Sequence, residues 1–416
     1  MKVGVVRETF PGETRVALVP DIVAELAKRD FDVVIEAEAG GQAGYADEAY
    51  AAKGARVVAT REEVFEAADI LAQVRMAGAN PEGCEADFAL LREGQIVVGA
   101  AEPLDRPDLI ERLARTKANA FGLELIPRTT RAQAMDILSS MATVAGYRAV
   151  LWAAERLPRF FPMFMTAAGT VAPAKVFIMG AGVAGLQAVA TAKRLGAVVS
   201  AYDIRPAVKE EVQSLGGKFI EMELESGAGE GGYAKAMDEE FYRRQRELMT
   251  KVVAGSDVVI TTAAVPGKKA PILVTEEMVA GMGAGSVIVD LAAEHGGNCA
   301  LTKADETVVA HGVTILGPTN VPATLSYHAS QMYSKNMFNF LVNMLSKDRE
   351  RKNEFDLEQE DDILAGTWMT KAGAVVHPDI RRALGVEATS GPATETAKMA
   401  ETPATQTPEK VQGVQN

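Results

Sequence analysis

The stretch Val176-Phe-Ile-Met-Gly180-Ala-Gly182-Val-Ala-Gly185 decides the fold, because it joins an apolar strand to a glycine-rich turn and the start of a helix. Residues 175–179 suit a buried parallel strand, and apolar residues recur at helical spacing after Gly182. In a G-x-G-x-x-G turn the first glycine allows a tight turn, the second lets the backbone approach a pyrophosphate, and the third permits close packing of helix and strand. A second predicted strand, 197–203, ends on Asp203. Together these features predict a dinucleotide-binding unit; the alternative is a glycine-rich turn with a structural role only.

Asp203 also indicates which dinucleotide is bound. A carboxylate at this place accepts hydrogen bonds from the adenosine ribose and repels a 2′-phosphate, so the sequence favours NAD(H) over NADP(H). The predicted helix start offers N–H groups and a positive dipole end to the pyrophosphate. The residues expected to contact the cofactor here are Gly180, Gly182, Val183, Ala184, Gly185, Asp203, Ile204 and Arg205.

Composition indicates a soluble, cytoplasmic protein of two domains. The chain has 416 residues with 43 Lys and Arg against 56 Asp and Glu, a net charge of −13 that argues against nucleic acid as a partner. Its two cysteines, Cys84 and Cys299, show no metal-ligand spacing, so no metal site is predicted. The longest stretch without charged residues, 307–334, is interrupted by glycines and prolines and is not expected to span a membrane.

Strand-like runs alternate with helical patterns on both sides of the fingerprint (residues 176–185), which predicts an α/β fold with two Rossmann-like parallel-sheet domains. Residues 139–157 and 322–345 are predicted as two long helices that join the domains. We expect residues 1–138 plus 322–384 to form a discontinuous first domain, with the NAD(H)-binding domain, 139–321, inserted into it. Residues 385–416 are rich in Thr, Ala, Glu, Pro and Gln and are expected to be disordered.

A second candidate binding stretch is residues 126–140. It places Arg, Gln, Asp and Ser side chains after a predicted strand end, where ligands of open α/β folds bind. These side chains supply both the donors and the acceptors that a nicotinamide carboxamide needs. The alternative is a capped helix start with solvated arginines, and the residues alone do not decide between the two. The candidates are Arg128, Thr129, Gln133, Asp136 and Ser139.

Two further segments are candidates for the cofactor site. Residues 221–240 contain Gly232 and Tyr233 in a glycine-bearing stretch that is either a surface loop or a lid. Residues 262–264 (Thr262, Ala263 and Ala264) end a predicted strand of the cofactor sheet. They either meet a ribose or form an ordinary strand-to-helix turn.

Several collinear segments within residues 1–380 resemble one family: the NAD(H)-binding alpha subunit (domain I) of proton-translocating NAD(P) transhydrogenase, which is related to alanine dehydrogenase. The segments are 1–8, 13–20, 126–150, 180–203, 231–235, 260–268 and 290–298. The resemblance implies direct hydride transfer between NADH and NADP⁺ bound on a partner subunit, coupled to proton movement across the membrane. Such transfer needs no acid, base or metal, only two nicotinamides held close together with water excluded.

The resemblance also assigns roles to residues and implies partners. It places Arg128, Gln133, Asp136 and Ser139 in the catalytic group that holds the nicotinamide and its ribose, with Gln133 reaching toward the NADP(H) of the partner. Tyr233 becomes the lid residue. The implied partners are a second copy of the chain, a membrane-embedded transhydrogenase subunit and an NADP(H)-binding beta subunit. The chain would then lie peripherally on the inner face of the membrane.

Two other functions stay open. Alanine dehydrogenase resembles the chain at Arg15 and in the fingerprint domain, but it needs a lysine and a histidine for its keto acid. This sequence has Arg75 at the first place and no histidine near Glu102 at the second. The third possibility is a non-catalytic module that binds NAD and senses redox state.

Overall fold

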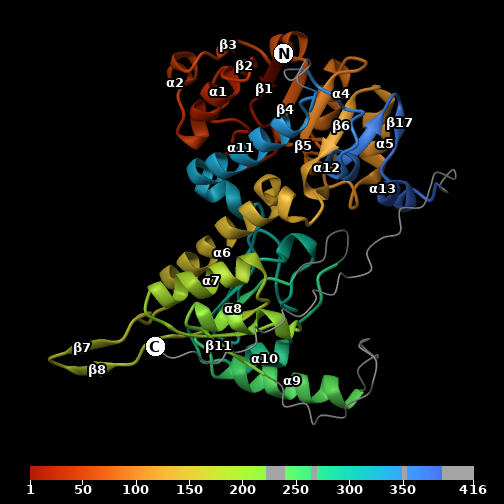
Figure 1. Ribbon diagram of the computed structural model, residues 1–416. Helices are drawn as coiled ribbons and strands as arrows, with labels where there is room; N and C mark the ends of the chain where they lie inside the picture. The colour runs from red at the N-terminus through yellow and green to blue at the C-terminus, as the bar shows by residue number, and fades with distance from the viewer. Residues whose placement is uncertain (222–238, 264–268, 349–353, 387–416) are drawn as a thin grey trace, which may run out of the picture.

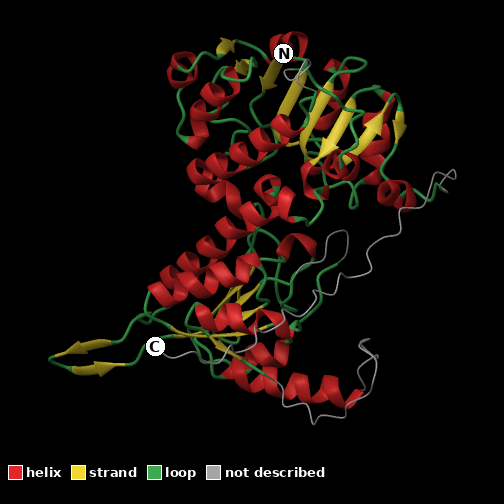
Figure 2. Cartoon of the chain, viewed as in Figure 1, coloured by secondary structure: helices red, strands yellow, loops and turns green. Residues whose placement is uncertain are grey.

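The computed structural model describes residues 1–221, 239–263, 269–348 and 354–386. It confirms the α/β class: helices pack on two large, mainly parallel sheets that lie in different halves of the molecule (Figures 1 and 2). Gly232, Tyr233 and Ala264, and nearly all of the predicted disordered tail, fall outside the described residues.

The first sheet has the strand order β17-β16-β6-β5-β4-β1-β2-β3. Its six N-terminal strands are parallel, whereas β16 and β17 come from the far end of the chain and add an antiparallel edge. The strands are β1 (Lys2–Val5), β2 (Asp32–Glu36), β3 (Arg56–Val58), β4 (Ile70–Arg75), β5 (Ile96–Ala100), β6 (Asn119–Gly122), β16 (Trp368–Lys371) and β17 (Ala374–Val375).

Helices cover both faces of this sheet, which explains why its strands are apolar almost throughout. In β4, Ile70 and Ala72 belong to one core, while Leu71 between them packs in the other core with Val64 and Phe65 of α3. The helices of this half are α1 (Pro20–Ala27), α2 (Asp47–Ala52), α3 (Arg61–Ala67), α4 (Cys84–Leu90), α5 (Pro107–Arg115), α12 (Asp362–Thr367) and α13 (Pro378–Ala383).

The second sheet has the order β11-β10-β9-β12-β13-β15-β14. Apart from β14 this is the Rossmann order 3-2-1-4-5-6, with the fingerprint strand β9 beside the point where the order reverses. Its strands are β9 (Lys175–Met179), β10 (Val198–Tyr202), β11 (Lys218–Phe219), β12 (Val258–Thr261), β13 (Val287–Asp290), β14 (Thr307–Ala310) and β15 (Val313–Leu316). Its helices are α7 (Val183–Arg194), α8 (Lys209–Ser214), α9 (Glu239–Ala254) and α10 (Glu276–Ala280).

Two edge hairpins depart from the expected parallel sheets. Residues 311 and 312 join β14 to β15, and residues 372 and 373 join β16 to β17. All four have positive φ: 53° at His311, 77° at Gly312, 48° at Ala372 and 88° at Gly373. Positive φ at both central residues is the type I′ geometry that suits a two-residue hairpin. Each pair has only one glycine and lacks the usual Asn or Asp before it, so the local signal was weak.

Two long helices lie between the sheets, α6 (Ile137–Arg156) and α11 (Ser326–Asn343), the latter entered through a 3₁₀ turn, η7 (Val321–Leu325). Among the described helices α6 is the one long and apolar enough to cross a membrane, by length and composition alone. Its residues Ala149, Val150 and Ala153 are fully buried in the core of the second sheet. Their apolar character is therefore accounted for by packing within the molecule.

A hairpin that the sequence did not predict lies in the chain between α6 and the fingerprint strand β9. It consists of β7 (Phe164–Thr166) and β8 (Gly169–Val171) and extends away from the body of the molecule (Figure 1). Apolar side chains at and before it are exposed, including Met165 at 76 % and Phe160 at 57 %.

Candidate functional site

The three glycines of the fingerprint, Gly180, Gly182 and Gly185, differ in their local geometry. Gly180 has φ 102°, where other residues are strained. A Cβ on Gly185 would lie 1.8 Å from the Gly180 carbonyl oxygen, so only glycine lets α7 start this close to β9. Gly182 is different, because among the described residues a Cβ there would meet nothing nearer than the Arg205 guanidinium at 3.9 Å. Gly182 is the N-cap of α7 and supplies no capping side chain, so the first N–H groups of that helix lack this partner.

Asp203 lies directly after β10 and is already bound by protein groups. Its Oδ1 accepts from the N and Nε of Arg205 at 2.9 and 3.0 Å, and its Oδ2 accepts from Ala181 N at 2.8 Å and Arg205 Nη2 at 3.0 Å. Burial opposes ionisation of this carboxyl, but the hydrogen bonds from Arg205 and Ala181 outweigh it and lower the pKa of Asp203. Asp203 is therefore a charged group at the fingerprint turn, and Arg205 is its partner.

The end of β12 lies against the same turn. The Thr262 hydroxyl donates to the Gly180 carbonyl at 3.0 Å. Ala263 is held on both backbone groups by Asn298, whose Oδ1 accepts from Ala263 N at 3.0 Å and whose Nδ2 donates to Ala263 O at 2.8 Å. The predicted residues Thr262 and Ala263 thus border the fingerprint.

Asp290 organises the loop that carries Asn298. It is fully buried, and its two oxygens accept hydrogen bonds from Thr261 Oγ1, Ala292 N, Asn298 N, Cys299 N and Thr302 Oγ1 at 2.7–3.0 Å. Five donors satisfy the buried charge. Asp290 thus holds the loop that carries Asn298, a residue that sequence patterns alone did not single out.

The predicted nicotinamide stretch is a 3₁₀ turn, η4 (Thr130–Met135), followed by α6. Asn336 and Asn339 of α11 both donate to the Ala134 carbonyl, at 2.9 and 2.8 Å, and so fix the turn. Arg131 bonds to Asp361 at 2.8 Å and also to Asp362. Arg131 is thus used structurally, whereas the side chains of Arg128, Thr129 and Gln133 are partly or fully exposed.

Asp136 caps α6, as the alternative interpretation predicted. Its Oδ1 accepts from Ser139 N at 3.0 Å, and its Oδ2 accepts from the Ser139 hydroxyl at 2.5 Å. Both residues remain partly exposed. The cap does not exclude ligand binding, since each carboxylate oxygen still has an acceptor position.

Helix α6 connects this stretch to the fingerprint. A Cβ on Gly146, in the middle of α6, would lie 2.1 Å from the carbonyl oxygen of Ala184 in the first turn of α7. The two helices therefore touch backbone to backbone where α7 begins. A glycine inside a predicted helix was the available signal for such an approach.

A buried polar cluster joins the first sheet to the segment before α11. Glu13 bonds to Arg15 through Nε at 2.7 Å and Nη2 at 2.6 Å, and to Arg75 Nε at 3.1 Å. Asn320 accepts from both arginines at 3.2 and 3.1 Å and donates to Glu13 at 3.2 Å. Burial opposes ionisation of Glu13, but its arginine partners dominate and hold its pKa at about 2. Burial and the charge of Glu13 raise the pKa of the neighbouring Glu8 to about 8.

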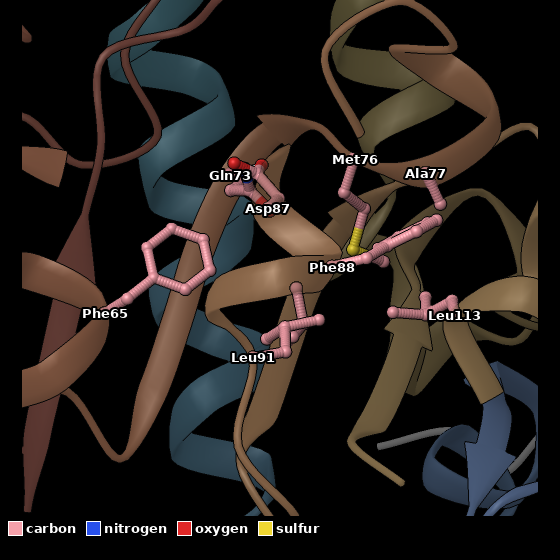
Figure 3. Close-up of a pocket in the computed structure, with 9 residues that line it drawn as sticks. Phe65, Gln73, Met76, Ala77, Asp87, Phe88, Leu91 and Leu113 are labelled. Carbon is pink, nitrogen blue, oxygen red and sulfur yellow. The ribbon is translucent and has the colours of Figure 1, made fainter. Parts of the chain in front are cut away.

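A small cavity lies in the first sheet, away from the fingerprint (Figure 3). Its volume is about 10 Å³, close to the minimum for one water molecule. Phe65, Phe88 and Leu113 form apolar walls, and the Gln73 amide donates to Asp87 at 2.8 Å at its polar end. It is too small for a nucleotide.

Two protein-family models match most of the chain. The N-terminal domain of alanine dehydrogenase/PNT matches residues 4–145, and the C-terminal domain of alanine dehydrogenase/PNT matches residues 149–378. The chain belongs to the alanine dehydrogenase/PNT family. Within it, the chain is 46 % identical over 381 residues to the first of the parts that make up NAD(P) transhydrogenase subunit alpha in Rhodospirillum rubrum, covering 91 % of this chain and 98 % of that one. The predicted resemblance is confirmed.

Other members of the family fit the same picture. The crystal structure of transhydrogenase from Sinorhizobium meliloti is 42 % identical, with a TM-score of 0.81 over 90 % of this chain and all of that one. Alanine dehydrogenase of Mycolicibacterium smegmatis is 31 % identical over 300 residues, 71 % of this chain and 74 % of that one. The L-alanine dehydrogenase structure is 26 % identical, with a TM-score of 0.75 over 92 % of this chain and 99 % of that one. On identity, the transhydrogenase alpha subunits are the nearer of these two groups.

Proposed function

We propose that the chain is the NAD(H)-binding subunit of a proton-translocating nicotinamide nucleotide transhydrogenase. It would take part in direct hydride transfer between NADH and the NADP⁺ of a partner subunit, coupled to proton movement. The observation that carries the proposal is the uncapped start of α7, open over Gly182 and bordered by Asp203, in a chain that matches the Rhodospirillum rubrum transhydrogenase alpha chain over almost its whole length.

The fingerprint fits the pyrophosphate and ribose of NAD(H). The first N–H groups of α7 have no side-chain cap and offer positive partial charge to a diphosphate. Asp203 places an ionised carboxylate, paired with Arg205, at the end of β10, and Thr262 and Ala263 border the other side of the turn. When bound, NADH would supply the hydride. This assignment takes 139–321 as the cofactor domain, inserted into a first domain made of 1–138 and 322–384.

The stretch 128–139 would position the nicotinamide. Asp136 and Ser139 are already held by the α6 cap, so their free lone pairs and donors are pre-oriented. Gln133 is exposed on a turn that α11 fixes through the Ala134 carbonyl, which suits a side chain that reaches toward a partner's nucleotide. Holding two nicotinamides close together is the whole chemical task, so no proton-transferring group is needed in this turn.

We further propose that the chain is a homodimer attached to the membrane through an embedded subunit and an NADP(H)-binding beta subunit, on the cytoplasmic side. The hairpin β7–β8 supports self-association, because Phe160, Met163, Phe164 and Met165 are all more than 40 % exposed. Contiguous exposed apolar side chains of this kind mark interaction surfaces. A lid role for Tyr233 is likewise a proposal, and Tyr233→Phe would weaken NADH binding modestly.

An alanine-dehydrogenase-like activity is the second candidate, since that branch of the family shares the fold. Against it, Arg15 and Arg75 are both engaged by Glu13 and Asn320 instead of being open to a keto acid. No hydrogen bond joins His295, in the turn after β13, to Glu102 within the described residues.

One experiment separates the candidates. The purified chain is mixed with an NADP(H)-binding transhydrogenase subunit, and reduction of an NADP⁺ analogue by NADH is followed. We expect exchange only in the mixture, with no NAD⁺-dependent oxidation of alanine by the chain alone. Alanine oxidation would support the second candidate, and NADH binding without exchange in the mixture would support a sensor module.

A further inference from the structure

Asp203 has no acceptor position left for a ribose hydroxyl. Its two oxygens accept four hydrogen bonds, three of them from Arg205 and one from Ala181 N. An ionised carboxylate offers about four lone-pair positions, so all are used. The side chain of Asp203 is only 7 % exposed. A nucleotide can therefore reach this carboxylate only by displacing a donor.

Arg205 is the donor that can move. Its side chain is 57 % exposed, and within the described part of the chain its guanidinium makes hydrogen bonds to Asp203 alone. One of its nitrogens lies 3.9 Å from the position that a Cβ of Gly182 would take, at the mouth of the fingerprint turn. Arginine is also the side chain best suited to bind a phosphate with two parallel hydrogen bonds.

We propose that Arg205 can bind the 2′-phosphate of NADP(H), and that its ion pair with Asp203 prevents this binding in the wild-type protein. Selectivity for NAD(H) is then a property of the ion pair and not of the acid alone. The inference rests on the proposed function in one respect: it takes the fingerprint turn as the adenosine site.

The two nucleotides place opposite demands on the pair. The ribose hydroxyls of NAD(H) need Asp203 to exchange part of its bonding to Arg205 for bonding to the sugar. A 2′-phosphate needs the guanidinium released and the carboxylate charge removed, because like charges repel strongly where water is scarce. Removing only the carboxylate charge of Asp203 should therefore make the Arg205 guanidinium available to bind a 2′-phosphate.

The test compares wild type with Asp203→Asn, Arg205→Gln and the double variant, using calorimetric titration with NADH and with NADPH. An asparagine oxygen can still accept the Ala181 N–H, so the turn keeps this support. We expect Asp203→Asn to bind NADPH at least about tenfold more tightly than wild type, the effect of one charge-assisted phosphate contact. The double variant should lose most of that gain, and the gain should shrink as salt is raised.

Equal NADPH affinity in Asp203→Asn and in the double variant would overturn the inference, as would the absence of any gain in Asp203→Asn. Asp203→Ser, which also removes the charge and keeps an acceptor, guards against a folding defect peculiar to asparagine. Melting temperatures are compared for all variants. Failure of wild type to bind NADH would overturn the proposed function instead, whereas normal NADH binding without the gain would overturn only the role of Arg205.

Discussion

Gln133 and Asp136 lie in one turn of chain, yet the protein uses their side chains differently. Asp136 supports its own helix by accepting from Ser139, while no hydrogen bond to the Gln133 side chain occurs within the described residues. A substitution of Asp136 therefore changes the cap of α6 as well as the proposed nicotinamide site, whereas a substitution of Gln133 breaks no hydrogen bond of that side chain within the described residues.

Gln133→Asn and Asp136→Asn should each slow hydride exchange by roughly one to three orders of magnitude, the effect of misplacing reacting groups by about 1 Å. Asn is as good an N-cap as Asp, so Asp136→Asn should keep α6 intact. NADH binding should change much less in Gln133→Asn. Stopped-flow exchange and NADH titration measure both, with Gln213→Asn, an exposed glutamine of α8, as the control. Near-wild-type exchange in both variants would place the nicotinamide elsewhere.

Glu13 carries a prediction about pH. Its pKa is lowered from 4.5 to about 2, so its contribution to stability is complete above pH 4.5 and is lost as pH falls through 2. Glu13→Gln leaves Arg15 and Arg75 buried with less compensation and should cost about 3–5 kcal/mol at pH 7. The cost should shrink by about 3 kcal/mol between pH 4.5 and 2.

Urea unfolding at pH 7, 4.5 and 3 measures this effect. Glu62→Gln, at an exposed glutamate of α3, is the matched control and should show little change. A difference between wild type and Glu13→Gln that stays constant from pH 7 to 3 would contradict the assignment of the lowered pKa to this cluster.

At the scale of the elements, the close contact of α6 with α7 requires a residue without a Cβ at position 146, which Gly146 provides. Ala is about 1 kcal/mol better than Gly inside a helix, so Gly146→Ala would stabilise an isolated α6. In the protein the added Cβ would lie 2.1 Å from the Ala184 carbonyl, and the helices must separate. We expect a net destabilisation of about 1–3 kcal/mol and weaker NADH binding, because the start of α7 shifts.

Gly366→Ala in α12 is the control, since its Cβ would approach nothing closer than the Pro127 ring at an ordinary 3.4 Å. That variant should be neutral or slightly stabilised. Thermal unfolding and NADH titration measure both proteins. Equal behaviour of the two variants would mean that the helix contact does not determine the geometry of the fingerprint.

Local patterns predicted the elements that are locally determined. The strand and helix of the fingerprint, the strand before Asp203 and the long α6 follow from apolar spacing and glycine placement, and the structure has them within a few residues of the predicted ends. The antiparallel edges were not predicted, because they depend on His311-Gly312 and Ala372-Gly373 turning tightly with positive φ. The pairing of Arg205 with Asp203 depends on side-chain direction, and Asn320 joins residues about three hundred positions apart. No window of sequence contains that information.

At the scale of the whole molecule, the exposed apolar side chains at and before the hairpin β7–β8 lead us to expect that two copies associate there. Phe160→Asp combined with Met165→Asp should convert a homodimer to a monomer, because charges replace apolar side chains where the two copies would meet. Sedimentation velocity over a range of concentrations measures this. Val309→Asp, at a residue that is 70 % exposed on the edge strand β14, is the control and should stay dimeric. A dimer that persists in the double variant would place the interface on another surface.

The backbone contact between Gly146 and Ala184 also means that α6 fixes the distance between two parts of the molecule. Asp136 caps the start of α6, and Gly146 in the middle of the helix contacts the start of α7. The distance between these two points is therefore set by a count of residues, about 15 Å for ten residues at 1.5 Å each. Inserting one alanine between Asp136 and Gly146 would lengthen this span by about 1.5 Å and rotate the turn by about 100°. Such a protein should still bind the adenosine half of the cofactor but lose hydride exchange, because the insertion displaces the turn proposed to hold the nicotinamide and leaves the fingerprint unchanged.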